Sequence, residues 1–223
     1  MTSIENKPGT HEFIVTDSEL LMDSPILGLR RDSVIMPGGT NSKREIVEHF
    51  GAVAIVAFDG ENIAMVKQYR HSVGERLWEL PAGLLDIAGE EALIGAQREL
   101  VEEAGLEAAN WSVLTDMITS PGFCDEASRI YLAQDLNNVP RPELADDEEA
   151  DMLTQWIPLS DAVAMVFNGQ LANSIAIAGV LAADAVIGGR AQARGTDTPF
   201  HFRPTALAGR RQAQGVVPDM KKL

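Results

Sequence analysis

A short run of charged and apolar residues at positions 98–106 constrains this chain more than any other segment. Its three glutamates, Glu99, Glu102 and Glu103, are spaced so that a helix places them on one side. The apolar residues around them step by three and four positions, as in a helix that packs on a core: Leu93, Ala96, Leu100 and Ala104. Gly105 suits the left-handed residue that closes such a helix. The sequence therefore predicts a core-packed helix that carries a row of carboxylates and ends at Gly105.

These three carboxylates have two interpretations. A solvated acidic face is the ordinary one, because charged side chains are mostly exposed. Like charges at this spacing cost about 0.2–0.5 kcal/mol per pair unless a cation lies between them, and a bound divalent cation is such a partner. Glu103 falls at the edge of the apolar face, where the core can partly desolvate it. Arg98 is spaced to form an ion pair with Glu102 and hold it in place.

The residues before this helix favour the second interpretation. Residues 79–83 read Glu-Leu-Pro-Ala-Gly, and Glu90 lies eight residues before Arg98. Together with residues 98–106 they resemble the Nudix box, whose pattern is Gly, five residues, Glu, seven residues, then Arg-Glu-apolar-any-Glu-Glu-any-Gly-apolar. One position departs from it, since six residues separate Gly83 from Glu90. We expect the extra residue to be absorbed before the helix starts, which leaves the place of Glu90 in the site open.

The resemblance implies a Nudix α/β/α sandwich around a mixed sheet. The order of elements agrees with this, because strands and helices follow one another without strict alternation, as in α+β and mixed α/β proteins. Strands are predicted at 11–20, 26–36, 44–50, 50–58, 62–69, 77–80, 111–118, 129–134 and 151–157, and further helices at 160–168 and 173–187. The apolar run at 50–58 is predicted to be a central strand, with 62–69 as its hairpin partner.

The chain is predicted to have three parts. Residues 1–48 hold three β-rich segments that cannot bury a core alone, so we expect a small antiparallel β unit that packs on the rest of the chain or on a second subunit. Residues 49–188 are the predicted catalytic domain. Residues 189–223 carry seven basic and two acidic residues. We expect this basic tail to lie over the acidic body or to be partly disordered, with Phe200 and Leu207 indicating that part of it packs.

Composition limits the partners. A net charge of −15 argues against nucleic acid and anionic membranes as partners. The single cysteine, Cys124, excludes an internal disulfide framework and is consistent with a reducing cytoplasm. No signal peptide is visible at the N-terminus, and the longest apolar stretch, 175–187, is too short to span a bilayer and carries Asp184. We therefore expect a cytoplasmic protein with a small-molecule partner.

The oxygen donors on the predicted helix indicate the metal. Glu99 and Glu103, with Glu102 beside them, suit Mg²⁺, which is usually held by one or two carboxylates plus substrate phosphates. The sequence has no His/Cys cluster with zinc spacing. By resemblance, the backbone carbonyl of Ala82 is a further ligand, and the cofactor is Mg²⁺ with Mn²⁺ as the alternative. Such an ion would neutralise a pyrophosphate and orient water for attack at phosphorus.

A base is also needed to activate that water. The segment 146–151 has five acids in six residues, and a solvated loop is its ordinary interpretation. In the ADP-ribose-cleaving branch of the family, a glutamate in an acidic loop before this late strand serves as the base. The resemblance therefore implies Glu149, with Glu148 as the close second and Glu102 of the helix as a third catalytic candidate.

Substrate specificity lies outside the box. Pro121 and Gly122 stand fifteen and sixteen residues after Leu106, where a proline resembles the signature of ADP-ribose pyrophosphatases, although Pro-Gly alone is an ordinary turn. Glu126 matches an acid that contacts substrate after that turn. Arg70 matches an arginine that binds the diphosphate, to which its forked donors are suited; an exposed surface arginine is the alternative.

The segment 44–48 resembles the Arg-Glu-x-x-Glu motif of the same branch. By that resemblance Arg44, Glu45 and Glu48 are substrate-binding candidates, since the acids there hold ribose hydroxyls or contact a partner subunit. The likeness runs from residue 14 to residue 182 and is greatest to actinobacterial-type ADP-ribose pyrophosphatases. No aromatic residue that stacks on adenine is matched.

The resemblance thus implies Mg²⁺-dependent hydrolysis of ADP-ribose to AMP and ribose 5-phosphate. It also implies a homodimer whose N-terminal strands are often exchanged between subunits. The nearest alternative is the same chemistry on another nucleoside diphosphate sugar or a dinucleotide. The alternative of another class is a Nudix domain that binds a nucleotide without catalysis.

Overall fold

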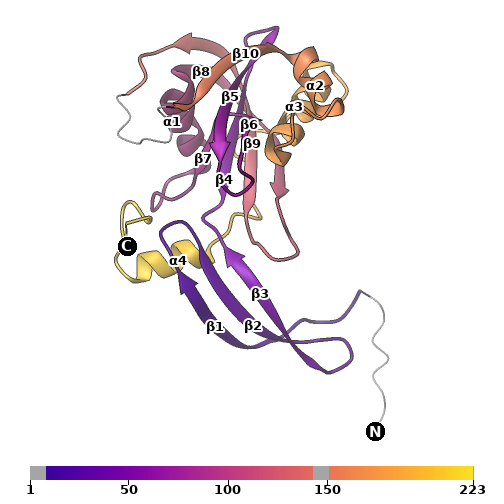
Figure 1. Ribbon diagram of the computed structural model, residues 1–223, viewed down its shortest axis with the longest axis vertical. Helices are drawn as coiled ribbons and strands as arrows, with labels where there is room; N and C mark the ends of the chain where they lie inside the picture. Colours follow the sequence, from indigo (N-terminus) through magenta and orange to yellow (C-terminus); the bar gives the residue numbers. More distant parts are fainter. Residues whose placement is uncertain (1–8, 143–150, 223) are drawn as a thin grey trace.

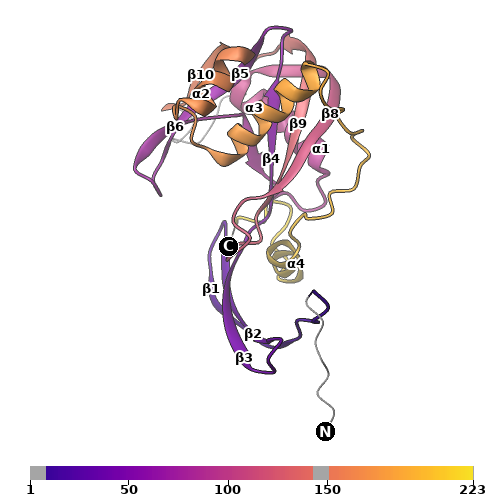
Figure 2. The same ribbon diagram turned by 90° about the vertical axis from the view of Figure 1, so that its right-hand side faces the viewer.

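The computed structural model describes residues 9–142 and 151–222. Figure 1 shows a body of sheets and helices from which a three-stranded sheet projects. Figure 2 shows the same separation from the side, with one helix, α4, lying where the two parts meet. The predicted α/β/α sandwich with a small N-terminal antiparallel unit is confirmed.

The projecting sheet is antiparallel, in the order β1-β2-β3. Its strands are β1 (Val15–Asp23), β2 (Gly28–Ile35) and β3 (Asn41–Glu48). Within these strands only Gly28, Asp32 and Glu48 are buried, and none of them is a large apolar residue. The sheet therefore has no hydrophobic core of its own in this chain.

The body contains two sheets. One has the order β7-β4-β9-β8, and its strands are β4 (Ala52–Ala57), β7 (Ala82–Leu84), β8 (Leu106–Ile118) and β9 (Ala127–Asn138). It is mixed, because β4 and β9 are parallel while the other pairs are antiparallel. The other sheet has the order β10-β5-β6, and its strands are β5 (Asn62–Arg70), β6 (Glu75–Glu79) and β10 (Leu153–Pro158).

The predicted hairpin between 50–58 and 62–69 is wrong. Strand β5 pairs with β6 and β10, and it meets the segment of β4 only at an isolated bridge between Phe58 and Ile63. Strand β4 instead pairs with β9 along one edge and with β7 along residues 52–54 of the other. The turn itself forms, since Asp59 Oδ1 accepts hydrogen bonds from the N–H groups of Glu61 and Asn62 at 2.9 and 2.7 Å.

Strand β4 separates two hydrophobic cores. Ala54 and Val56 face helices α2 (Leu159–Phe167) and α3 (Ser174–Ile187), whereas Val53 and Ile55 face helix α1 (Ala92–Ala104). A strand covered on both faces is apolar throughout, which explains its unbroken hydrophobic sequence. No helix in the described ranges is long and apolar enough to cross a membrane.

The basic tail packs along the body and ends beside the projecting sheet. Arg194 forms a backbone bridge with Val113 of β8. Helix α4 (Ala206–Ala213) then lies between the body and β1–β2 (Figures 1 and 2). Leu207 and Met220 are buried against Phe50 in a third, smaller core. The tail thus joins the body to the N-terminal sheet.

Candidate active site

Helix α1 carries the three box glutamates and ends as predicted. Gly105 takes φ 65° and ψ 37°, and its N–H reaches the carbonyls of Leu100 and Val101. The predicted apolar face is confirmed: Ala96 and Leu100 are fully buried, and Leu93 and Ala104 pack against the same core. This packing sets the rotation of the helix, and with it the direction of the acids.

Two of these glutamates lie against strand β7. The N–H of Ala82 donates to Glu103 Oε2 at 2.8 Å. A Cβ atom placed on Gly83 would lie 1.9 Å from the carboxyl carbon of Glu99, so only glycine leaves room for that side chain. Glu99 and Glu103 are 8% and 6% exposed. The strand and the helix thus hold two carboxylates close together and mostly out of water.

Arg98 is the cation within this group of acids. Its Nη1 donates to Glu99 Oε1 at 2.6 Å and to Glu102 Oε2 at 2.9 Å. Its Nε donates to Glu90 Oε1 at 3.2 Å. Despite the extra loop residue, Glu90 therefore reaches the acid side of α1, where its carboxylate also lies over Gly95.

Burial controls the protonation of the central acid. It raises the pKa of the Glu99 carboxyl to about 7, and the ion pair with Arg98 acts against that rise. A carboxylate with this environment gains from any further positive charge beside it.

The donor types fit a magnesium ion. Glu99, Glu102 and Glu103 offer oxygen atoms only, the ligands that a hard cation prefers. Across residues 9–142 and 151–222, no three His, Cys, Asp or Glu side chains are already grouped as a metal site. Arg98 holds two of the three carboxylates, so an ion bound here would share them with that guanidinium.

The base candidates Glu148 and Glu149 lie outside the described residues. The chain on each side of them contacts the acid-bearing end of α1. Arg141 Nε donates to the carbonyl of Glu102 at 2.9 Å, and Thr154 Oγ1 donates to the carbonyl of Glu103 at 3.4 Å. The third candidate, Glu102, is partly buried on α1, with Oε2 on Arg98.

Arg70 lies at the end of β5 and is held by a buried acid. Its Nε and Nη2 donate to the two carboxylate oxygens of Glu79 at 2.9 and 2.6 Å. The Arg70 side chain is 44% exposed, whereas that of Glu79 is 4% exposed. This paired arrangement fixes the plane of the guanidinium and leaves part of it facing solvent.

The predicted Pro-Gly signature forms the turn between β8 and β9. Pro121 and Gly122 are exposed at its tip. Glu126 stands at its base, where Oε2 accepts a hydrogen bond from Thr119 Oγ1 at 2.6 Å. The turn also pairs with the end of β3, since the N–H of Val47 donates to the carbonyl of Phe123 at 2.7 Å.

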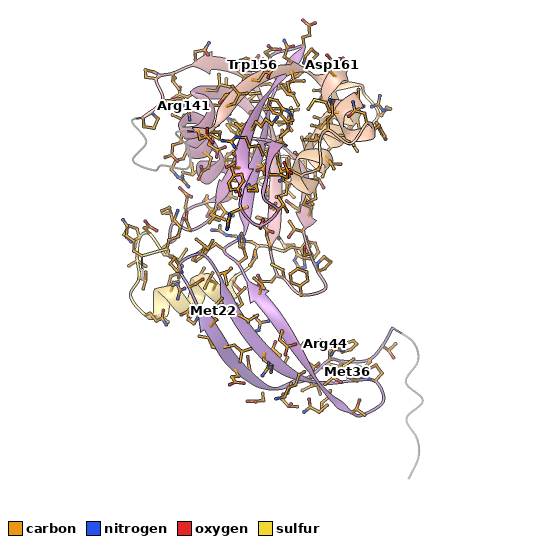
Figure 3. All side chains as sticks on the ribbon, in the orientation of Figure 1. Met22, Met36, Arg44, Arg141, Trp156 and Asp161 are labelled. Atoms are coloured by element: carbon orange, nitrogen blue, oxygen red, sulfur yellow. The ribbon has the colours of Figure 1, made fainter. Side chains whose placement is uncertain are left out.

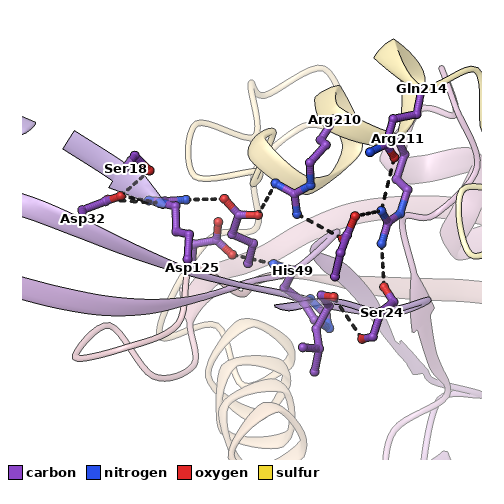
Figure 4. Close-up of polar contacts among 12 residues, drawn as sticks. Ser18, Ser24, Asp32, His49, Asp125, Arg210, Arg211 and Gln214 are labelled. Carbon is purple, nitrogen blue, oxygen red and sulfur yellow. Dashed lines mark hydrogen bonds and ion pairs between the residues drawn. The ribbon is translucent and has the colours of Figure 1, made fainter. Parts of the chain in front are cut away.

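The structure separates the three candidates on β3. Arg44 and Glu45 are exposed on the projecting sheet, and Arg44 lies well away from the body (Figure 3). Glu48 is buried and bound by two cations, Arg30 Nη1 at 2.7 Å and Arg210 Nη1 at 2.6 Å (Figure 4). Within one chain, Arg44 and Glu45 are therefore not brought to the acids of α1.

Arg210 and Arg211 of α4 were not singled out in the sequence. Both bind Asp23: Arg211 Nη1 lies 2.6 Å from Asp23 Oδ2, and Arg210, which also binds Glu48, places Nη2 3.5 Å from Asp23 Oδ1 (Figure 4). Arg211 also donates to the carbonyl of Ser24 at 2.6 Å. These partners are more than 160 positions apart, and no local pattern marks such a contact.

A cavity of about 480 Å³ lies elsewhere, between β10 and α2. Trp156 and Asp161, labelled in Figure 3, line it together with Trp78. None of the predicted site residues lines this cavity. It lies on the α2 side of the sheets, whereas the acids are on α1, which covers the other side (Figure 1).

Helices cover both faces of the mixed sheet, and Glu99 and Glu103 of α1 pack against Ala82 and Gly83 of β7. This arrangement is that of a Nudix α/β/α protein. The NUDIX domain model matches residues 48–176. This is more than half of the chain, so the protein belongs to the NUDIX family and is a Nudix hydrolase.

Individual relatives agree with this class. The chain is 57% identical over 202 residues to the ADP-ribose pyrophosphatase of Mycobacterium tuberculosis, covering 90% of this chain and 97% of that protein. It is 39% identical over 150 residues to the ADP-ribose pyrophosphatase of Bacillus subtilis, covering 66% of this chain and 80% of that protein. A solved structure of an ADP compounds hydrolase aligns with TM-score 0.69 over 81% of this chain and 98% of its own, at 18% identity, which shows the common fold.

Proposed function

We propose that this protein hydrolyses ADP-ribose to AMP and ribose 5-phosphate with the help of a divalent cation. The observation that carries the proposal is the 57% identity to an ADP-ribose pyrophosphatase over 97% of that protein's length. The packing of Glu99 and Glu103 of α1 against β7 supports the chemistry, because it provides oxygen donors beside Ala82 and Gly83.

The proposed ligands of the ion are Glu99, Glu103 and the backbone carbonyl of Ala82, with Glu102 beside them. Mg²⁺ is the proposed ion and Mn²⁺ the alternative. When bound, the ion would neutralise charge on the diphosphate and lower the pKa of a bound water. Arg98 orients Glu99 and Glu102, since it contacts both at 2.6 and 2.9 Å.

Arg70 is the proposed contact to the diphosphate. Glu79 fixes its orientation through two hydrogen bonds, so little side-chain entropy remains to be lost when substrate binds. Glu126, held by Thr119, and the turn at Pro121 and Gly122 are the proposed contacts to the remainder of the substrate.

Glu149 is the proposed base, with Glu148 second and Glu102 third. Support comes from the residues that flank the acidic segment. Arg141 and Thr154 both bind the backbone of α1 at the turn that carries Glu102 and Glu103. A base in a segment anchored there would be within reach of a water at these carboxylates.

We also propose a homodimer that forms through residues 1–48, with 49–188 as the catalytic part and 189–223 as a packed tail. Seven large apolar side chains on and beside β1 are exposed: Phe13, Ile14, Val15, Leu20, Leu21, Met22 and Ile26. Large apolar side chains exposed in this way, at the two ends of β1, support an interface there. A second subunit would also explain why Arg44 and Glu45 lie far from the acids of their own chain. The proposed location of the protein is the cytoplasm.

The test is a substrate panel with purified protein. ADP-ribose is compared with GDP-mannose, NADH and diadenosine polyphosphates by kcat/KM, with and without EDTA. We expect ADP-ribose to rank first and EDTA to abolish turnover. Product analysis in isotopically labelled water identifies the phosphorus that is attacked. A higher kcat/KM for another substrate, or binding of ADP-ribose without any product, would refute the proposal.

A further inference from the structure

The loop between β7 and α1, residues 85–91, is bound by the C-terminal end of the chain. Ile87 and Asp219 form an antiparallel bridge. The N–H of Ala88 donates to the carbonyl of Pro218 at 2.8 Å, and the N–H of Met220 donates to the carbonyl of Asp86 at 2.9 Å. The C-terminal segment, residues 218–221, therefore pairs with the middle of this active-site loop as a short strand would.

An ion pair between a buried acid and a half-exposed lysine reinforces the backbone pairing. The side chains of Asp86 and Lys221 are 4% and 44% exposed, and Asp86 Oδ2 lies 2.6 Å from Lys221 Nζ. Met220, next to Lys221, is buried against Phe50 and Leu207 and so anchors the segment. A buried carboxylate that loses its cation becomes an uncompensated charge, which is strongly destabilising.

The loop is connected to the acids of α1 by a series of contacts. At its end, Glu90 binds Arg98 through its carboxylate at 3.2 Å. Arg98 in turn binds Glu99 and Glu102. The tail touches this end of the loop as well, since Arg203 Nη1 donates to the carbonyl of Glu90 at 3.0 Å. A shift of the loop would therefore move Glu90 and disturb Arg98.

We infer that the C-terminal segment holds the active-site loop in its working conformation, with Lys221 as a positioning residue for the carboxylates of α1. The loop is one residue longer than the Nudix pattern between Gly83 and Glu90, and the segment binds the middle of that longer loop. As a statement about catalysis, the inference rests on the proposed function. As a statement about the loop, it stands on the contacts alone.

Lys222 provides a matched control for the test. It has the same charge and lies one position on, but its side chain is 81% exposed and pairs with Asp219 instead. Lys221→Met and Lys222→Met are made in the full chain and compared with the wild type. Because a residue that orients metal ligands from outside changes activity or metal affinity by about 10–100-fold, we expect Lys221→Met to lower kcat, or to raise the Mg²⁺ concentration for half-maximal activity, within that range.

The KM for substrate should stay close to the wild-type value in Lys221→Met, because the segment does not contact the proposed substrate residues. Lys221→Arg should restore most of the lost activity, and Lys222→Met should resemble the wild type. Equal kinetics for the Lys221→Met and Lys222→Met variants would overturn the inference. So would a lower melting temperature in Lys221→Met with unchanged kcat and Mg²⁺ requirement, since that is the result of a structural anchor only.

Hydrogen exchange at the backbone amide of Ala88 gives a readout that needs no substrate. We expect this amide to exchange at least about tenfold faster in Lys221→Met than in Lys222→Met, because the buried Asp86 carboxylate beside its hydrogen bond loses its cation. If the wild type turns over no substrate, the proposed function fails while this measurement still decides the inference. Unchanged exchange would refute it. Asp86→Asn, which removes the charge that needs Lys221, serves as the second variant if Lys221→Met does not fold.

Discussion

The position of the Glu99 carboxylate depends on the absence of a Cβ atom at Gly83. The carboxyl group of Glu99 occupies the space in which any other residue at position 83 would place its Cβ. The three acids of α1 were predictable from the sequence, because their spacing is local. Their dependence on Gly83 was not, since it arises only when β7 is laid against the helix.

Replacing Gly83 with alanine should displace the Glu99 carboxylate. The flexible side chain can move away, so we expect kcat to fall by about 100-fold, the cost of a misplacement of roughly 1 Å, with a much smaller change in melting temperature. Gly38→Ala is the control, because a Cβ there meets nothing within 4 Å. Activity of Gly83→Ala equal to that of Gly38→Ala would contradict the role given to Glu99.

Among the elements, the helix that follows from a local sequence pattern was predicted correctly, whereas the neighbours of strand β5 were not. Helix α1 and its end at Gly105 follow from apolar spacing within one segment. The pairing of β5 does not, because it depends on β4 pairing with β7 and β9 instead. The contacts of α4 are likewise set by residues from the other end of the chain. The basic composition of the tail predicted only that it lies over the acidic body or is partly disordered.

The link between α4 and β1 should depend on pH. The hydrogen bond from Arg211 lowers the pKa of Asp23 below its ordinary value of 3.8, although burial acts against it. A carboxyl whose pKa is lowered by folding adds stability above its unfolded pKa and loses that contribution as pH falls through the folded pKa. The difference in free energy of unfolding between wild type and Asp23→Asn should therefore be full at neutral pH and decline as pH falls below 3.8 towards the lower pKa of the folded state.

The measurement is denaturant unfolding of both proteins at a series of pH values. Asp17→Asn, a change at an exposed site on the same strand, is the control. A difference between wild type and Asp23→Asn that stays constant down to low pH would show that the Arg211 hydrogen bond does not act through the charge of Asp23.

In the molecule as a whole, the N-terminal sheet is the part that has no hydrophobic core within one chain. It projects from the body in both views and is joined to it mainly by α4 and the end of β3 (Figures 1 and 2). Large apolar residues are exposed at both ends of β1, and a sheet with no core is not stable by itself. The proposed second subunit would account for both features.

Charges placed on β1 should break that assembly. Leu20 and Met22 are 44% and 48% exposed and flank a register shift near the end of β1. We expect the wild type to have twice the chain mass of 24.1 kDa in light scattering, and the double variant Leu20→Asp/Met22→Asp to shift toward the single mass and lose activity. Phe167→Asp, at an exposed apolar residue on α2, is the control. A double variant that keeps the wild-type mass would exclude this part of β1 as the interface.

The carboxylates of α1 are proposed to hold a divalent cation against the diphosphate of the substrate. A crystal structure with Mg²⁺ and a non-hydrolysable ADP-ribose analogue tests this role most directly. We expect an ion about 2.0–2.1 Å from oxygens of Glu99 and Glu103 and from a diphosphate oxygen. An analogue bound in the protein with no ion at these two side chains would contradict it.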